Sequence, residues 1–135
     1  MSEPKQLTIK LPTLIRLNKK TTFSLNLNQY RNAHFHILNK AKVLFEEAIA
    51  DQVIKLPKME RLIITYFYFN GTKRQSDVAN ICSVVDKFFS DTLVNKGIIE
   101  DDNFDVLEGV TYRYGGYRKG DTCVEADITY VERNP

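Results

Sequence analysis

One run constrains the fold of this chain most, the stretch ERLIITYFYFNG at residues 60–71. It is β-branched and aromatic, and it is apolar on both of the faces that alternate along an extended strand. Such a run is typical of a central strand that is covered on both sides. Asn70 and Gly71 supply a turn where the run ends. We therefore expect a β-sheet with this strand inside it.

A helix is predicted over residues 78–95, directly after that strand. At about 100° per residue its apolar side chains fall within an arc of roughly 140°, which predicts one buried face. Asn80, Lys87 and Asp91 share the polar border of this face, whereas Asp86 points nearer the solvent side. Gly97 follows the last turn, as a C-cap glycine does. The residues of the predicted buried face are Ile81, Val84, Val85, Phe88 and Phe89.

The remaining elements follow from the same periodicities. Residues 32–51 repeat apolar side chains every three or four positions and predict a helix, with Pro57 in the loop that follows. Strands are predicted at residues 6–11, 14–17, 105–115 and 122–132, with residues 115–121 as a glycine-rich hairpin loop between the last two. The order predicts one domain over residues 1–135, a mixed α/β fold in which helices flank a mixed β-sheet.

Composition places the chain among ordinary globular proteins. Its 135 residues are 43% hydrophobic and 27% charged, near the average for soluble domains. No apolar run approaches the roughly 20 residues that span a bilayer, so we expect a cytoplasmic protein without a membrane segment. Cys82 and Cys123 are too few for a zinc motif or a disulfide framework, and we expect buried thiols.

The charge is distributed unevenly along the chain. Residues 1–76 carry 13 Lys and Arg against 5 Asp and Glu, whereas residues 77–135 carry 6 against 12. The basic first half of the chain could bind a polyanion while the acidic second half holds a metal ion, as a metal-dependent nuclease requires. The alternative is that a solvated basic face and a solvated acidic face merely balance.

The order of polar residues around the helix at 78–95 resembles the RusA family of Holliday-junction resolvases. The resemblance covers roughly residues 60–115 and rests on ordered groups at family-like spacing. It implies a small α/β homodimer from a bacterium or a phage-infected cell that binds four-way DNA junctions and cuts two strands symmetrically. Aspartates would hold Mg²⁺, or Mn²⁺, as the cofactor. The groups are Lys73, Arg74, Asp77 and Asn80, then Lys87, Asp91 and Leu93, then Gly97, Ile98, Ile99, Asp101 and Asp102, with residues 28–31 matching an Asn/Tyr/Arg segment after the first strand.

Carried over by position, the resemblance implies roles for five residues. Asp77 is the first metal-binding aspartate, Lys87 is the catalytic lysine and Asp102 is the last metal-binding aspartate. Asp91 and Asp101 fill the accompanying acidic positions of the catalytic set, with Asp91 as a third metal ligand.

Two positions depart from the family pattern. The second Asp of its Asp-x-Asp-Asn motif is Ala79 here, and Ser83 stands where the lysine usually follows Asn80. Lys87 lies one helical turn later and keeps the four-residue spacing to Asp91. Asn80 or Asp91 could supply the missing oxygen, or the protein could bind junctions without cutting them.

Contacts with DNA phosphates are expected from cations spread over the chain. Three functions stay open: a junction-specific endonuclease, a non-catalytic binder of branched DNA, and a small oligomer whose acidic loop only keeps it soluble. Taken singly, Asp77 also fits a helix N-cap, Lys87 also fits a surface partner of Asp91, and His34 and His36 fit ordinary polar roles. The expected DNA contacts are Lys19, Lys20, Arg31, Lys73, Arg74, Asn80, Arg118 and Lys119.

Overall fold

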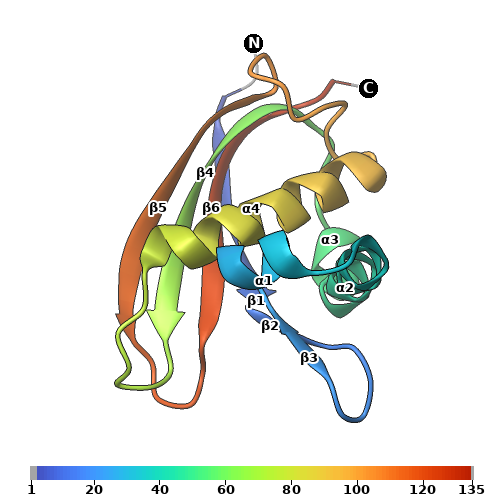
Figure 1. The fold of residues 1–135 in the computed structure, drawn as a ribbon. Helices are drawn as coiled ribbons and strands as arrows, with labels where there is room; N and C mark the ends of the chain where they lie inside the picture. Colours follow the sequence, from blue (N-terminus) through green and yellow to red (C-terminus); the bar gives the residue numbers. More distant parts are fainter. Residues whose placement is uncertain (1–2, 135) are drawn as a thin grey trace.

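A four-stranded mixed sheet forms one layer of the computed structural model, which describes residues 3–134 (Figure 1). The strand order is β1-β6-β4-β5, with β4 and β5 parallel and the other neighbours antiparallel. The four strands are β1 (Lys5–Pro12), β4 (Met59–Asn70), β5 (Leu107–Tyr117) and β6 (Cys123–Glu132).

The helices form a second layer on one face of this sheet, as Figure 1 shows. The longest helix, α4, connects the parallel strands β4 and β5, which a parallel pair requires because a hairpin cannot join its ends. A short hairpin of β2 and β3 and three smaller helices complete the layer. Their bounds are β2 (Leu14–Arg16), β3 (Thr22–Ser24), α1 (Leu27–Asn32), α2 (Phe35–Ala48), α3 (Ala50–Val53) and α4 (Val78–Asn95).

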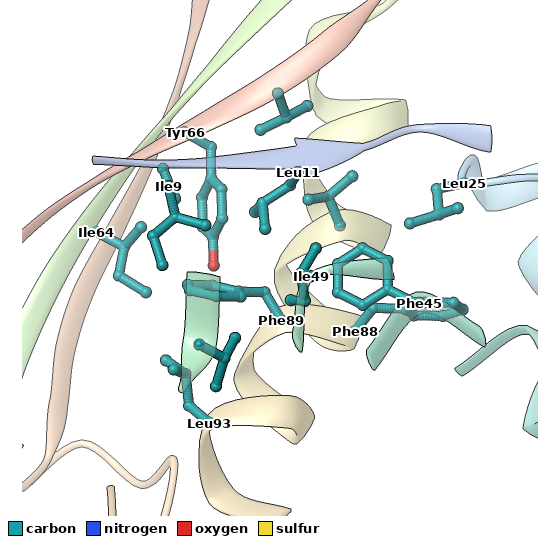
Figure 2. Close-up of a cluster of buried hydrophobic side chains, with 14 of the residues drawn as sticks. Ile9, Leu11, Leu25, Phe45, Ile49, Ile64, Tyr66, Phe88, Phe89 and Leu93 are labelled. Atoms are coloured by element: carbon teal, nitrogen blue, oxygen red, sulfur yellow. The ribbon is translucent and has the colours of Figure 1, made fainter. Parts of the chain in front are cut away.

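The hydrophobic core lies between the sheet and the helix layer (Figure 2). Phe88 of α4 is central to it, because its ring packs against Phe23 of β3 and edge-on against Phe45 of α2. Tyr66 of β4 meets the ring of Phe89 edge-on from the sheet side. The core therefore joins all the elements of residues 3–134 into one mixed α+β domain, and the predicted fold class is confirmed.

Several local predictions are confirmed in detail. The helix predicted at residues 78–95 is α4, with Val84, Val85, Phe88 and Phe89 buried. Its last residue is Asn95, and Gly97 follows the C-cap Lys96 with a positive φ of 71°, the left-handed conformation that glycine adopts without strain. Cys82 and Cys123 are buried thiols.

Three predictions about the surroundings of these elements are wrong. Strand β4 is covered on one face only, so that Ile63 on the other face is 48% exposed. Residues 115–121 do not form a hairpin loop, since β4 lies between β5 and β6. The helix predicted at residues 32–51 is divided into α2 and α3, with Ile49 between them in a non-helical conformation. Along residues 3–134, no helix has both the length and the apolar character that crossing a membrane requires.

Candidate functional site

A seam between α4 and β5 gathers polar side chains on the helix-covered face of the sheet. Cys82, Asp86 and Ser90 follow one another every fourth residue along α4, so they share one side of the helix. Tyr66 of β4 and Tyr112 of β5 are directly paired in the sheet and face this side. The carboxyl group of Asp86 thus lies over two tyrosines.

Asp86 is fixed by two hydrogen bonds to one of its carboxylate oxygens. The Tyr66 hydroxyl donates to Oδ1 over 2.7 Å, and the Ser90 hydroxyl donates to the same atom over 3.1 Å. Burial raises the pKa of Asp86 above its ordinary value, and these two hydrogen bonds and the charge of Lys87 partly oppose that rise. The nearby negative charge of Asp102 raises the Asp86 pKa further. Asp102, from the loop after α4, is therefore an electrostatic neighbour of Asp86.

Both tyrosine hydroxyls stay protonated at neutral pH. Burial raises the pKa of Tyr66 well above its ordinary value, and burial together with the charge of Asp86 raises the pKa of Tyr112 to about 12. A protonated Tyr66 donates a hydrogen bond that holds the Asp86 carboxylate in place.

Beyond Asp86 the seam opens into a cavity of about 580 Å³ at the carboxyl ends of β4 and β5. Lys73 and Arg74 bring positive charge to this cavity, and the first turn of α4 adds the positive end of the helix dipole, which favours anions. Tyr114 and Tyr117 are 58% and 51% exposed beside them. Cations next to exposed aromatic rings suit a nucleic-acid strand, whose phosphates and bases need both.

Asp77 lies at the start of α4 and acts as its N-cap. Its Oδ1 accepts hydrogen bonds from the backbone N–H groups of Ala79, over 3.0 Å, and of Asn80, over 3.4 Å. Asp101 is likewise engaged locally, because its carboxylate accepts from the Asp102 backbone N–H and from the Asn103 side chain.

Three other predicted site residues lie on the opposite border of α4, toward α1 and α2. The Asn80 side chain accepts from the Leu27 backbone N–H, and so anchors α1. The Lys87 ammonium lies 5.8 Å from the ring centroid of Tyr30. Asp91 pairs with Lys42 over 3.3 Å. The structure thus separates Asn80, Lys87 and Asp91 from the seam that holds Asp86.

The remaining predicted DNA contacts are dispersed over the surface. Lys19 and Lys20 lie at the tip of the β2–β3 hairpin, and Arg31 is exposed on α1. Arg118 stacks on the Phe69 ring at 3.7 Å and pairs with Glu125, so it belongs to the open face of the sheet. Lys119 is exposed beside it. Only Lys73 and Arg74 lie at the seam.

The predicted ligands Asp77, Asp91 and Asp102 do not form one metal site within a single chain. Among residues 3–134, no three His, Cys, Asp or Glu side chains come together in a set that could hold a metal ion. Asp102 is near enough to Asp86 for its charge to raise the Asp86 pKa, and both side chains carry hard oxygen atoms. Oxygen atoms of this kind are those that Mg²⁺ prefers, and Mg²⁺ usually binds one or two carboxylates and completes its shell with water and substrate phosphates.

Asp86 is the residue that sequence reasoning missed, since the prediction that it points to solvent is wrong. The apolar arc of α4 is wider than the five residues first counted, because Cys82 and Leu93 are also fully buried. Both lie within about 40° of Asp86 on a helical projection. Their positions could have indicated that this border of α4 meets the sheet.

Neither a scan against protein-family models nor a search of curated proteins finds a match for this chain. The assignment of a function therefore rests on the residues described above.

Proposed function

We propose that the protein binds branched DNA and cuts it as a divalent-metal-dependent endodeoxyribonuclease that resolves four-way junctions. The proposal joins the resemblance of residues 60–115 to RusA-type resolvases with the composition of the α4–β5 seam. It implies action on recombination or repair intermediates in the cytoplasm of a bacterial or phage-infected cell.

The observation that carries the proposal is the buried carboxylate of Asp86, whose pKa the charge of Asp102 raises, on the same face of the sheet as the cavity that Lys73 and Arg74 line at the N-terminal end of α4. A nuclease needs carboxylates where the scissile phosphate lies and cations where the flanking phosphates lie. Asp86 lies midway along α4, and the cations lie in the loop that precedes its first turn. Asp86 replaces Asp77 and Asp91 as the partner of Asp102 in this proposal.

Asp86 and Asp102 are the residues that would hold Mg²⁺ or Mn²⁺, which would supply charge stabilisation and an activated water for phosphodiester hydrolysis. Tyr66 and Ser90 would orient the Asp86 carboxylate through their hydrogen bonds to Oδ1. Lys73 and Arg74 would hold the backbone of the DNA without reading its sequence. Lys87 projects toward Tyr30, and so would contact a DNA arm from the other border of α4.

The test is cleavage of a labelled four-way junction beside a linear duplex of the same sequence, with Mg²⁺, with Mn²⁺ and with chelator. We expect paired symmetric cuts in the junction alone, lost with chelator and in Asp86→Asn and Asp102→Asn. Asp91→Asn is the matched control, because its carboxylate pairs with Lys42 away from the seam. Cleavage that survives Asp86→Asn but not Asp91→Asn would overturn the assignment of the site.

A second candidate is a non-catalytic protein that binds junctions. It is favoured by Ala79, which removes one family ligand, and by Asp77, whose carboxylate caps α4. Binding without metal, with an affinity that falls steeply with salt, is then expected. Ala79→Asp separates the two candidates: cleavage that appears only in this variant indicates a natural site that lacks a ligand.

A further inference from the structure

A cavity of about 350 Å³ lies at the C-terminal end of α4, where the residues that follow this helix meet α3 (Figure 1). Its volume falls within the range of small-ligand pockets, roughly 300–1,000 Å³. Most of the side chains that line it are apolar, and two are cationic. The apolar ones include Val53, Ile54, Leu56 and Ile98, and the cations are Lys58 and Lys96.

The cavity is open to solvent beside Ile54. Val53 and Ile98 are buried, whereas Ile54 is 83% exposed, more than any other large apolar side chain of residues 3–134. A single exposed isoleucine is ordinary on a protein surface. An isoleucine at the rim of an apolar cavity, however, gives an occupant more apolar contact than the cavity alone.

The positive charges of the cavity lie at one side of it, near Gly97. A β-carbon added to Gly97 would lie 3.3 Å from Nζ of Lys58, so this ammonium group rests against the chain just after α4. Lys96 is the neighbour of Gly97 in the chain and lines the same cavity. Two ammonium groups beside an apolar cavity favour a ligand that joins a carboxylate to an apolar group.

Both lysines are available to such a ligand. Within residues 3–134, no Asp or Glu forms an ion pair with either of them. Lysines near the C-terminal end of a helix also favour its dipole. The carbonyl groups of Thr92, Leu93 and Val94 at that end nevertheless accept hydrogen bonds from backbone N–H groups, so they do not require lysine donors.

We propose that this cavity binds the C-terminal end of a partner protein whose last residue is large and apolar and whose preceding residues are acidic. The terminal side chain packs between Val53, Ile98 and the exposed Ile54, and the terminal carboxylate pairs with Lys58 and Lys96. A C-terminal residue suits the site because it carries an apolar side chain and a carboxylate on one Cα atom.

The site is independent of the proposed function and distant from the residues that serve it. Lys58 precedes the first residue of β4, and Lys73 follows the last. The 12 residues of this strand span about 35 Å. A bound partner therefore leaves the cavity at Lys73 and Arg74 free.

Fluorescence anisotropy with a fluorescein-labelled peptide, Gly-Gly-Asp-Asp-Asp-Phe, tests the site. We expect saturable binding to the natural chain. Amidation of the peptide C-terminus should weaken binding about tenfold, because it removes the terminal carboxylate from the two ammonium groups. Lys58→Gln and Lys96→Gln should each weaken binding of the free-acid peptide about tenfold for the same reason, and Ile54→Ser should weaken it several-fold.

Lys40→Gln and Val43→Ser are the matched controls. They make the same chemical changes at exposed positions of α2 that do not line the cavity, so they should bind as the natural chain does. Because all five substitutions are at exposed positions, each variant should fold, and circular dichroism checks this.

Three results would overturn the proposal. The first is the absence of saturable peptide binding, and the second is binding that Lys58→Gln and Lys96→Gln leave unchanged. The third is displacement of the peptide by octanoate at lower concentrations than by unlabelled peptide, which would indicate a site for a free aliphatic acid instead of a protein terminus. These titrations contain neither DNA nor a metal ion, so their outcome is independent of the junction-cleavage test.

Discussion

At the scale of single residues, the most informative feature is the unfavourable environment of Asp86. A carboxylate that is largely buried costs free energy unless hydrogen bonds compensate for the lost water. Tyr66 and Ser90 compensate in part, while the nearby charge of Asp102 adds to the cost. Functional sites are where such costs are commonly retained.

Asp86→Asn should therefore separate stability from function. Because burial raises the Asp86 pKa above its ordinary 3.8, the folded chain holds this proton more tightly than the unfolded chain does. The stability that this contributes is present below pH 3.8 and is lost as pH rises through the higher pKa of the folded state. Thermal unfolding should show the variant to be at least as stable as the natural chain at neutral pH, with the difference shrinking in acid.

The same variant should lose junction cleavage by about 100-fold or more if Asp86 stabilises the transition state. Tight junction binding that persists alongside this loss would indicate a role in the reaction. A variant that binds and cuts normally would mean that Asp86 has only a structural role.

At the scale of elements, the two ends of α4 have different tasks. The N-terminal end has the Asp77 cap and adjoins the basic loop of Lys73 and Arg74, whereas the C-terminal end leads through Gly97 into the loop of Asp102. The helix of 18 residues spans about 25 Å, so these ends cannot share a ligand directly. The middle of the helix, where Asp86 lies, is the part that Asp102 approaches.

Asp77→Ala tests whether the cap accounts for the role of this residue. Loss of both hydrogen bonds should lower the free energy of unfolding by about 1 kcal/mol, and Asp77→Ser should restore most of it. Urea denaturation measures both values. If Asp77 serves only as a cap, the Asp77→Ser variant also keeps junction cleavage. A large loss of cleavage in a stable Asp77→Ser variant would instead indicate that Asp77 is a metal ligand.

Lys73→Ala and Arg74→Ala test the loop that precedes α4. Each should weaken junction binding several-fold and reduce the slope of log affinity against log salt by about one, because each removes one phosphate contact. Titrations at several salt concentrations measure the slope. Lys55→Ala is the control, since Lys55 is exposed before the start of β4, at the opposite end of that strand from the cavity, and the slope should not change.

At the scale of the whole molecule, one core holds the helix layer to the sheet. Phe88 contacts aromatic rings from β3 and α2 while its own helix lies against the sheet. Within residues 3–134 no second core covers the open face of the sheet, where charged side chains pair with one another, as Arg118 does with Glu125 and Lys10 with Asp121. Stability therefore depends on a single layer of buried side chains.

Phe88→Ala should lower the free energy of unfolding by about 3–5 kcal/mol, because it leaves a cavity where three elements meet. Far-ultraviolet circular dichroism and tyrosine fluorescence should report the same transition, as expected for one cooperative unit. Transitions that separate in the variant would indicate that α1, α2 and the β2–β3 hairpin unfold independently of the sheet.

Elements with local signals are predictable from the amino-acid sequence. The periodicity of residues 78–95 and the alternation of residues 122–132 predict α4 and β6 closely, because one buried face imposes one repeat. Asp77 and Gly97 mark the ends of α4 through interactions within a few residues. The basic loop is also evident in the sequence, where Lys73 and Arg74 are neighbours.

The side chains that meet across the sheet depend on long-range packing, which local patterns do not encode. The apolar run of β4 predicts cover on both faces, yet the helices lie on one, because the loops carry every helix to the same side. Strand β4 lies between β5 and β6 although they are adjacent in sequence, since strand order depends on long-range pairing. Asp86 lies over Tyr66 and near Asp102 for the same reason: the seam that contains them exists only once α4 has packed beside β5.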